Sequence, residues 1–270
     1  MRHLILALAL MMSAGFAVAG DSGLTALQTG DDSRGWEAVG RLDIDGRGFC
    51  TGALIAPDLV LTAAHCLFDS ETGARIDHGK IEFLAGWRNG RASAYRWVKR
   101  AVTHPDFIYE GELAADRVRN DVALLELHHP INNTSVVPFE TDRRPRKGQE
   151  IGVVSYARDR SEAPSLQEVC AVTARQQGVL IMSCDVNFGS SGAPVFSFED
   201  GEPKIVSVVS AKAEVGGQRV SLGTQLEGPL EVLKAELAAG RGVYGNTPAP
   251  RVNRIAVGAR STTGAKFIKN

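Results

Sequence analysis

The sequence predicts an all-β fold, and three observations support this prediction. Short apolar or alternating runs dominate the chain from Trp36 to about Gln225. Gly, Pro, Asp and Asn interrupt these runs at close intervals, as turns between short strands require. Only the segment 229–239 has the apolar spacing of a helix. Many short strands with so little helix indicate an antiparallel sandwich or barrel rather than alternating strand–helix units.

The expected strands are short runs of mainly aliphatic residues. In chain order they lie at 53–56, 59–62, 81–84, 122–127, 151–154 and 205–209. The expected helix follows Gly228 and ends before Gly240, and glycine is common just outside both ends of helices. Its predicted buried face consists of Leu230, Val232, Leu233 and Leu237.

The amino terminus has the pattern of a secretory signal. Arg2 and His3 precede an apolar run that ends at Met12, and Ala17-Val18-Ala19 offers the small residues that a signal peptidase accepts. We therefore expect cleavage after Ala19 and a secreted or periplasmic location. An uncleaved anchor helix is the alternative, but the apolar run is short for that role.

Composition argues against two other classes of protein. The 270 residues carry a formal net charge of −1, without the basic excess that is typical of nucleic-acid-binding proteins. No apolar stretch beyond the first twenty residues is long enough for a membrane helix. We therefore expect no nucleic-acid partner and no transmembrane segment.

Export to an oxidising compartment favours disulfides for the four cysteines. Cys50 lies 16 residues before Cys66, and Cys170 lies 14 residues before Cys184. Pairing nearest neighbours makes two short loops, although four cysteines permit three pairings. A metal site is disfavoured because the sequence has no CxxC or HxxxH spacing.

The chain divides by composition into five segments. They are a signal at 1–19, a loose arm or short propeptide at 20–35, strand-rich halves at 36–136 and 137–240, and a tail at 241–270. A polar stretch at 128–148 separates the halves, and its basic run at 143–147 is typical of a solvated linker. The tail has six basic residues and no acidic one, which favours an extended or disordered segment.

Three segments carry residues that are suited to nucleophilic catalysis. They are Leu61-Thr-Ala-Ala-His65-Cys66, Asn120-Asp121-Val-Ala-Leu-Leu125 and Gly189-Ser-Ser191-Gly-Ala-Pro194. A serine hydroxyl needs an adjacent base, and an imidazole can accept and return a proton near neutral pH. Taken singly, the three are more typical of a buried histidine, a turn and a loop. Their occurrence together, in the order His, Asp, Ser, favours catalysis.

Together with Cys50-Thr-Gly-Ala-Leu-Ile55, these motifs resemble those of the chymotrypsin-like (trypsin-fold) serine peptidases, and most closely their secreted bacterial branch. The resemblance covers about 36–240 and implies two antiparallel six-stranded β-barrels of the chymotrypsin type with a C-terminal helix. It also implies a serine-type endopeptidase that works through an acyl-enzyme. Protein or peptide substrates are then expected, with no cofactor, no metal and a monomeric chain.

The resemblance assigns the catalytic roles residue by residue. Ser191 is the expected nucleophile, His65 the base and Asp121 the group that orients the imidazole. The N–H groups of Gly189 and Ser191 are the expected oxyanion hole. Ser190 is the alternative nucleophile, but only Ser191 has Gly two positions before, Gly directly after and Pro three after.

The family pattern also bears on which aspartate is the acid of the triad. Asp116 is the alternative acid, but it lacks the apolar strand that follows Asp121.

In animal zymogens the residue before the nucleophile is an aspartate that pairs with the new amino terminus. Ser190 occupies that position here, so we do not expect this activation switch.

The resemblance also implies an S1 pocket. In trypsin-like members an aspartate six residues before the nucleophile lies at the base of S1, and here that position is Asp185. A buried carboxylate there would favour Arg or Lys at P1. The other expected S1 residues are Ser210, Lys212, which is placed to neutralise Asp185, and Gly223. Glutamyl specificity in the family usually relies on a late histidine, and none follows His129.

Other interpretations are weaker. An α/β-hydrolase esterase carries its histidine after its serine, and no histidine follows Ser191. A subtilisin-like peptidase has an α/β fold, which needs more helix. A catalytically silent relative that binds a partner through the same cleft is the remaining alternative, although all three triad positions are filled.

Three acidic residues, Asp69, Glu71 and Asp77, lie in a loop where some relatives bind calcium. Their spacing is typical of a solvated acidic loop.

Overall fold

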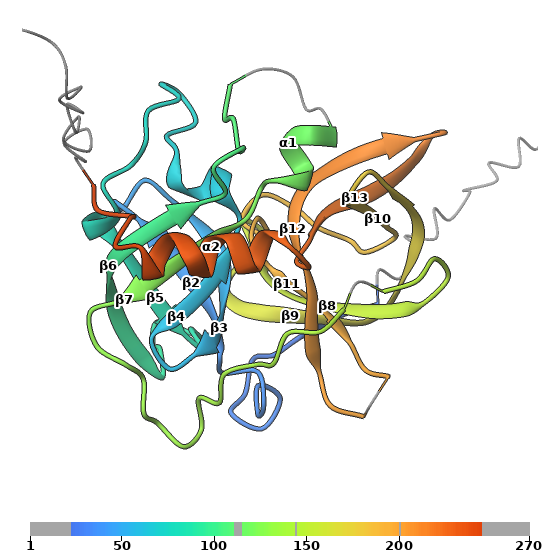
Figure 1. Cartoon of the computed structure of the whole chain (residues 1–270). Coiled ribbons are helices and arrows are strands. Elements are labelled where there is room, and N and C mark those ends of the chain that lie inside the picture. Colours follow the sequence, from blue (N-terminus) through green and yellow to red (C-terminus); the bar gives the residue numbers. More distant parts are fainter. Residues whose placement is uncertain (1–22, 111–114, 144, 200, 245–270) are drawn as a thin grey trace, which may run out of the picture.

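The computed structural model describes residues 23–110, 115–143, 145–199 and 201–244 (Figure 1). The expected signal peptide, its cleavage site and residues 245–270 of the expected tail lie outside these ranges. Two barrels of antiparallel strands lie side by side within them, as the family resemblance implied. No helix in the described ranges is long and apolar enough to cross a membrane.

The first barrel closes in the order β2-β3-β4-β7-β6-β5. Its strands are β2 (Val39–Ile44), β3 (Gly48–Ala56), β4 (Leu59–Thr62), β5 (Ile81–Ala85), β6 (Ala94–Thr103) and β7 (Ala123–Leu127). Two 3-10 helices, η1 (Ala64–Leu67) and η2 (His78–Lys80), and the short helix α1 (Ala115–Arg119) lie in its loops. Branched and aromatic side chains such as Leu54, Leu61 and Phe83 are completely buried in its core.

The second barrel has the strands β8 (Glu150–Ala157), β9 (Arg160–Gln176), β10 (Val179–Met182), β11 (Pro194–Ser197), β12 (Lys204–Val215) and β13 (Gln218–Gln225). They run in the order β9-β10-β13-β12-β11-β8, and pairing of β8 with β9 closes the ring. Its core is aliphatic and includes Ile151, Leu180 and Val195, all completely buried. The Cys170–Cys184 disulfide lies in the same core.

The amino-terminal arm is docked on the second barrel, which differs from the expected loose arm. β1 (Leu24–Ala26) pairs with β9, so that Leu24 lies opposite Gln167. The next residue, Leu27, is only 3% exposed, and its N–H donates to the Pro164 carbonyl oxygen at 2.9 Å. Backbone pairing therefore positions this arm. β1 itself has no buried face, so an apolar pattern could not reveal it.

The C-terminal helix α2 (Pro229–Ala238) follows the second barrel and packs on β6 and β7 of the first (Figure 1). Leu230, Leu233 and Leu237 are buried, as expected. Val232 is not, because 36% of its surface is exposed. Arg100 of β6 also donates to the Leu237 carbonyl oxygen at 3.1 Å, which ties the helix end to the barrel.

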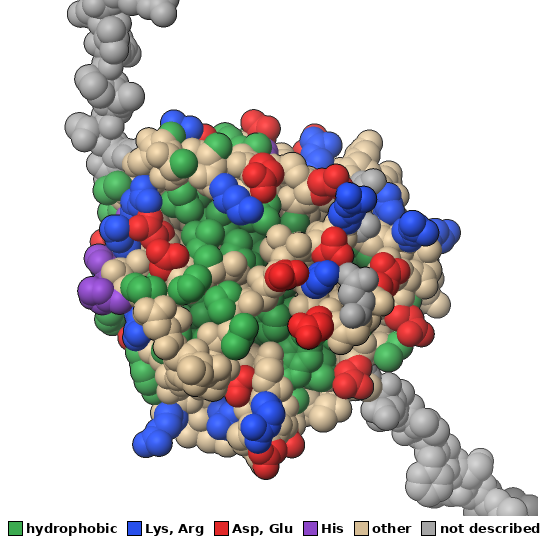
Figure 2. Space-filling view, turned by 60° about the horizontal axis from the view of Figure 1, so that its bottom comes forward, with side chains coloured by type: hydrophobic (Ala, Val, Ile, Leu, Met, Phe, Trp, Pro, Cys, Tyr) green, Lys and Arg blue, Asp and Glu red, His purple; other side chains and the backbone are tan. Residues whose placement is uncertain are grey.

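Charged side chains of both signs are interspersed on the face shown in Figure 2, around an area of hydrophobic side chains. On this face no extended basic surface is present. This arrangement agrees with the near-neutral composition of the chain.

Candidate active site

His65 is held at the edge of a cleft by the turn that follows β4. After Thr62 the chain passes through Ala63 and enters η1 at Ala64, and both alanines are completely buried. The Cys50–Cys66 disulfide ties this turn to β3. The small alanine side chains allow the turn to pack tightly, and the disulfide holds it in place. The sequence expectation that nearest-neighbour cysteines pair is confirmed for both disulfides.

Asp121 lies between α1 and β7 and is only 2% exposed. Its Oδ2 is 2.6 Å from His65 Nδ1, and its Oδ1 accepts the His65 backbone N–H at 2.8 Å. The Ser210 hydroxyl of β12 also donates to Oδ2. These donors offset the lost hydration of a buried carboxylate. With Nδ1 engaged by Asp121, His65 Nε2 is the ring atom that remains to exchange a proton.

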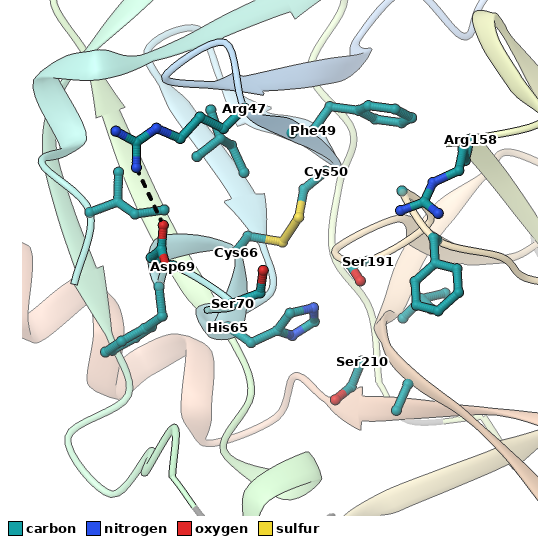
Figure 3. A pocket seen from close by; sticks show the side chains of 18 of the residues that line it. Arg47, Phe49, Cys50, His65, Cys66, Asp69, Ser70, Arg158, Ser191 and Ser210 are labelled. Carbon is teal, nitrogen blue, oxygen red and sulfur yellow. Dashed lines mark ion pairs between the residues drawn. A yellow bond between two sulfur atoms is a disulfide. The ribbon is translucent and has the colours of Figure 1, made fainter. Parts of the chain in front are cut away.

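Ser191 lies on the opposite wall of the same cleft, and the His65 ring points toward it (Figure 3). Among the described residues no hydrogen bond joins the two side chains. Such contacts are often long when no substrate is bound. The two residues come from different barrels, so the fold brings together positions that are 126 residues apart in the chain.

The two serines of the motif have different environments. Ser190 is completely buried, and its hydroxyl donates to the Tyr156 carbonyl oxygen at 3.1 Å. The Ser190 hydroxyl also lies 3.3 Å from the Ser155 hydroxyl. Ser191, by contrast, borders the cleft. A substrate can therefore reach Ser191 but not Ser190.

Asp116, the alternative acid, lies on α1 and forms an ion pair with Arg119 at 2.8 Å. Its side chain is 75% exposed, so it makes no buried contact with the imidazole. In both cases the structure distinguishes the two candidates: Asp121 contacts His65 and Asp116 does not, and Ser191 borders the cleft and Ser190 does not.

The backbone beside Ser191 presents two N–H groups that have no protein acceptor within the described ranges. They belong to Gly189 and Ser191, which both line the cleft. Gly189 has a φ of +98°, and a Cβ atom there would lie 2.4 Å from the Phe49 ring. Glycine is therefore required at this position. Free N–H groups beside a hydroxyl are suited to bind an oxygen that becomes negative during acyl transfer.

The cleft between the barrels has a volume of about 910 Å³. The first barrel contributes the β2–β3 hairpin, η1 and the loop after it, and the second barrel contributes the loop before β11 and part of β12. These walls place both catalytic candidates on one continuous surface. A groove of this size accommodates several residues of an extended peptide.

The structure does not support Asp185 at the base of S1. Asp185 is exposed and is not among the residues that line the cleft. Its N–H donates to Gln167 Oε1 at 2.8 Å, and the next residue, Val186, takes the position on the cleft wall. The buried carboxylate on which the expectation of Arg or Lys at P1 depended is therefore absent from the cleft.

The other expected S1 residues differ in position. Gly223 is buried inside the second barrel, where a Cβ atom would lie 2.8 Å from the Met182 methyl group. Ser210 and Lys212 do line the cleft. Ser210 donates to Asp121, whereas Lys212 contacts Asn187 Oδ1 at 3.3 Å instead of neutralising Asp185.

Sequence reasoning missed a cationic pair around Phe188, an exposed aromatic residue directly before Gly189. The Lys212 ammonium lies 4.3 Å from the centre of the Phe188 ring, and the Arg158 guanidinium lies 5.1 Å from it. All three residues line the cleft, and Figure 3 shows Arg158 on the Ser191 side of it. An exposed aromatic residue next to the oxyanion glycine was the available signal, but its two partners are distant in the chain.

The acidic loop is organised by its own hydrogen bonds. Asp69 Oδ1 accepts the N–H groups of Glu71 and Thr72 and the Thr72 hydroxyl, and these bonds lower the pKa of Asp69. Asp77 accepts the Gly79 N–H at the start of η2. Within the described ranges, the one cluster of potential ligand atoms is Cys50, His65 and Cys66. Its two sulfur atoms are joined in a disulfide and are not thiolates that could bind a metal.

Comparisons with known proteins agree with this geometry. The family model described as "Trypsin-like peptidase domain" matches residues 50–204. The glutamyl endopeptidase of Bacillus licheniformis is 27% identical over 150 residues, which cover 55% of this chain and 45% of that protein. Serine protease 23 of Mus musculus is 29% identical over 163 residues, which cover 54% of this chain and 42% of that protein. The chain thus matches less than half the length of these relatives.

A solved structure of a Glu endopeptidase in complex with MPD superposes with a TM-score of 0.66 at 20% identity. The superposition covers 81% of this chain and 98% of that one, so the two share a fold across both barrels. The family model spans more than half of the chain and contains the His65, Asp121 and Ser191 motifs. The chain belongs to the trypsin-like peptidase domain family.

Proposed function

We propose that this protein is a secreted serine endopeptidase that cleaves peptide bonds with Ser191, His65 and Asp121. One observation carries the proposal. The buried Asp121, the half-buried His65 that it contacts and an accessible serine border one cleft, beside two N–H groups that have no acceptor among the described residues. The signal-like residues 2–19 and the two disulfides support export.

The proposed mechanism follows from the positions of these groups. Ser191 Oγ attacks the scissile carbonyl carbon while His65 Nε2 takes the hydroxyl proton. The carbonyl oxygen becomes negative and accepts hydrogen bonds from the N–H groups of Gly189 and Ser191. The imidazolium, stabilised by Asp121, then gives its proton to the leaving amine. Water repeats the sequence on the acyl-enzyme and releases the second product.

Replacing the two adjacent serines tests this mechanism. We expect Ser191→Ala to fold and to lose turnover by at least about 10⁴-fold, because the nucleophile is removed. Ser190→Ala is the matched control and should keep turnover within about tenfold, because the buried Ser190 hydroxyl does not reach substrate. Hydrolysis of a casein or peptide substrate measures both. Unchanged hydrolysis by Ser191→Ala would refute the assignment.

We further propose that the cleft favours acidic side chains next to the scissile bond. Each of the four carboxylates that line the cleft has a basic partner. The pairs are Asp43 with Arg41 at 3.7 Å, Asp45 with Lys80 at 3.5 Å, Asp69 with Arg47 at 3.5 Å, and Asp121 with His65.

The cations beside Phe188 differ from these carboxylates. Arg158 and Lys212 have no carboxylate within 4 Å among the described residues. The uncompensated charge beside Ser191 is therefore positive, which opposes Arg and Lys and favours Asp and Glu.

Cleavage-site sequencing on a mixed peptide library tests this preference. We expect Asp and Glu to be enriched, and Lys and Arg depleted, within two residues of the cleaved bond. Arg158→Gln and Lys212→Gln should each reduce the enrichment by about two- to fivefold, and high salt should reduce it as well. Arg117→Gln is the control, because Arg117 lines the cleft but lies over Tyr109 instead of Phe188. A preference for Lys or Arg would contradict the proposal.

A further inference from the structure

The segment that carries the proposed oxyanion hole is fixed at four consecutive peptide units. The Phe188 carbonyl oxygen accepts the Arg158 N–H at 2.7 Å, and the Ser190 carbonyl oxygen accepts the Ala193 N–H at 3.0 Å. Because a trans peptide unit directs its C=O and N–H to opposite sides, these bonds set the directions of the Gly189 and Ser191 N–H groups.

The two remaining units are held by one residue of the other barrel, Thr51 of β3. Its hydroxyl donates to the Gly189 carbonyl oxygen at 2.9 Å. Its backbone N–H donates to the Ser191 carbonyl oxygen, also at 2.9 Å. Thr51 therefore binds the peptide units on both sides of the unit that carries the Ser191 N–H.

Thr51 itself is held in one position. It is completely buried, and its hydroxyl oxygen accepts the Tyr156 N–H at 3.1 Å. Its carbonyl oxygen accepts the Thr62 hydroxyl at 2.8 Å. Its N–H and hydroxyl donate to segment 189–191, as described above. Every polar atom of Thr51 therefore has a partner, and the side chain has a defined orientation.

Such support is needed at this segment. Gly189 and Gly192 both have positive φ values, +98° and +76°, and glycine backbone can rotate between many conformations. The side chain of Ser190, which lies between them, bonds only to neutral groups of Ser155, Tyr156 and Asn187. Within the described ranges no charged group holds the segment through Ser190, and the neutral hydrogen bonds of Thr51 add support from the first barrel.

We propose that Thr51 is a positioning residue for the oxyanion hole. Its hydroxyl and its N–H hold segment 189–191 so that the Gly189 and Ser191 N–H groups face the substrate carbonyl oxygen. The first barrel thus contributes to transition-state stabilisation through Thr51, in addition to supplying His65 and Asp121. The inference rests on the proposed peptidase function.

Removing the hydroxyl without changing the size of the side chain tests the proposal. We expect Thr51→Val to lower kcat by about ten- to a hundredfold while KM changes by less than about threefold, because loss of one oxyanion donor costs about 10²–10³ in kcat. The rate of labelling by a fluorophosphonate, which also forms an oxyanion-like adduct, should fall by a similar factor. Thr51→Ser retains the hydroxyl and should restore both rates to within about threefold of wild type.

Ser207→Ala is the control for the loss of one buried hydroxyl. Ser207 is also completely buried, and its hydroxyl donates to the Thr224 carbonyl oxygen at 2.7 Å, but it contacts neither Thr51 nor a carbonyl of segment 189–191. Ser207→Ala should lose thermal stability and keep kcat near the wild-type value. Should Thr51→Val not fold, Thr51→Ala is compared with Ser207→Ala in the same assays.

The outcomes separate this inference from the proposed function. Wild-type kcat in the Thr51 variants that lack the hydroxyl, or an equal loss in the Ser207 variant, would overturn the role of Thr51 and leave the peptidase function intact. Absence of Ser191-dependent turnover in the wild-type protein would overturn both.

Discussion

Individual residues at the contact between the barrels decide whether the proposed catalytic groups meet. Gly192 is the clearest case, because a Cβ atom there would lie 2.1 Å from the Thr62 hydroxyl oxygen and 2.4 Å from the Thr51 carbonyl oxygen. Only hydrogen fits between the segment 189–192 and the first barrel. The glycine that follows Ser191 in the motif therefore has a physical reason: it allows the close approach of two backbones.

We expect Gly192→Ala to unfold more easily by about 2 kcal/mol or more and to lose most of its activity, because the clash adds to the strain of a positive φ. Gly217→Ala is the control. Gly217 has a similar φ of +79° but open space around its Cβ position, so this variant should lose only about 1 kcal/mol and keep its activity. Urea unfolding and peptide hydrolysis measure the two effects. Equal losses in both variants would contradict the packing argument.

The sequence indicated the surroundings of some of these residues correctly and of others incorrectly. The choice of Ser191 over Ser190 depended on glycine and proline spacing, and the burial of Ser190 agrees with it. Asp185 shows the limit of this reasoning. Its position in the motif is that of an S1 residue, but whether its side chain faces the cleft depends on the local path of the chain after Cys184. One sequence cannot specify that direction.

Among the elements, the strands with continuous aliphatic runs were the most predictable. The expected runs at 53–56, 59–62 and 122–127 lie in or overlap β3, β4 and β7, which are buried against one core. β1 could not be predicted, because it pairs through its backbone and two of its three side chains are exposed. The helix was predicted at the correct position, but one of its expected core residues faces solvent.

That difference on α2 gives a direct test of its packing. We expect Leu233→Ala to lower the free energy of unfolding by about 2–5 kcal/mol, because Leu233 is completely buried between the helix and the first barrel. Val232→Ala, the neighbouring control, should change it by less than about 0.5 kcal/mol. Chemical denaturation of the two variants measures both values. A comparable loss in both would place the helix in a different orientation.

For the whole molecule, stability should depend on pH through two buried histidines. Burial lowers the pKa of His78 and of His104 below the ordinary histidine value of 6.5, and it outweighs the nearby Asp77 and Asp106, which raise these pKa values. Unfolded histidines bind protons at higher pH than these folded ones. The unfolded state therefore takes up more protons as the pH falls below about 6.5, and the folded state loses stability.

We therefore expect the free energy of unfolding to fall as the pH is lowered from 7.5 through 6.5 toward the lowered pKa values. His104→Asn should flatten this dependence, because it removes one of the two titrating groups. Urea titrations at a series of pH values give the slope for both proteins. A wild-type stability that stays constant or rises across this range would contradict the burial of the two neutral imidazoles.

The two-barrel architecture also determines how the proposed active site forms. His65 and Asp121 come from the first barrel and Ser191 from the second, so the site exists only when both barrels have folded and docked. The order of the motifs in the sequence predicts that these three residues take part, and the structure places them on one cleft. The charge balance around Phe188 and the hydrogen bonds of Thr51 could not be predicted, since both depend on contacts between distant segments.

Labelling of the folded wild-type protein with a fluorophosphonate, followed by peptide mapping, tests the central claim most directly. The nucleophile assignment predicts one covalent adduct, located on Ser191, with none on Ser190 and a strongly reduced rate in His65→Ala. An unlabelled protein, an adduct on another serine, or an unchanged rate without the imidazole would contradict a Ser191 hydroxyl that His65 makes reactive.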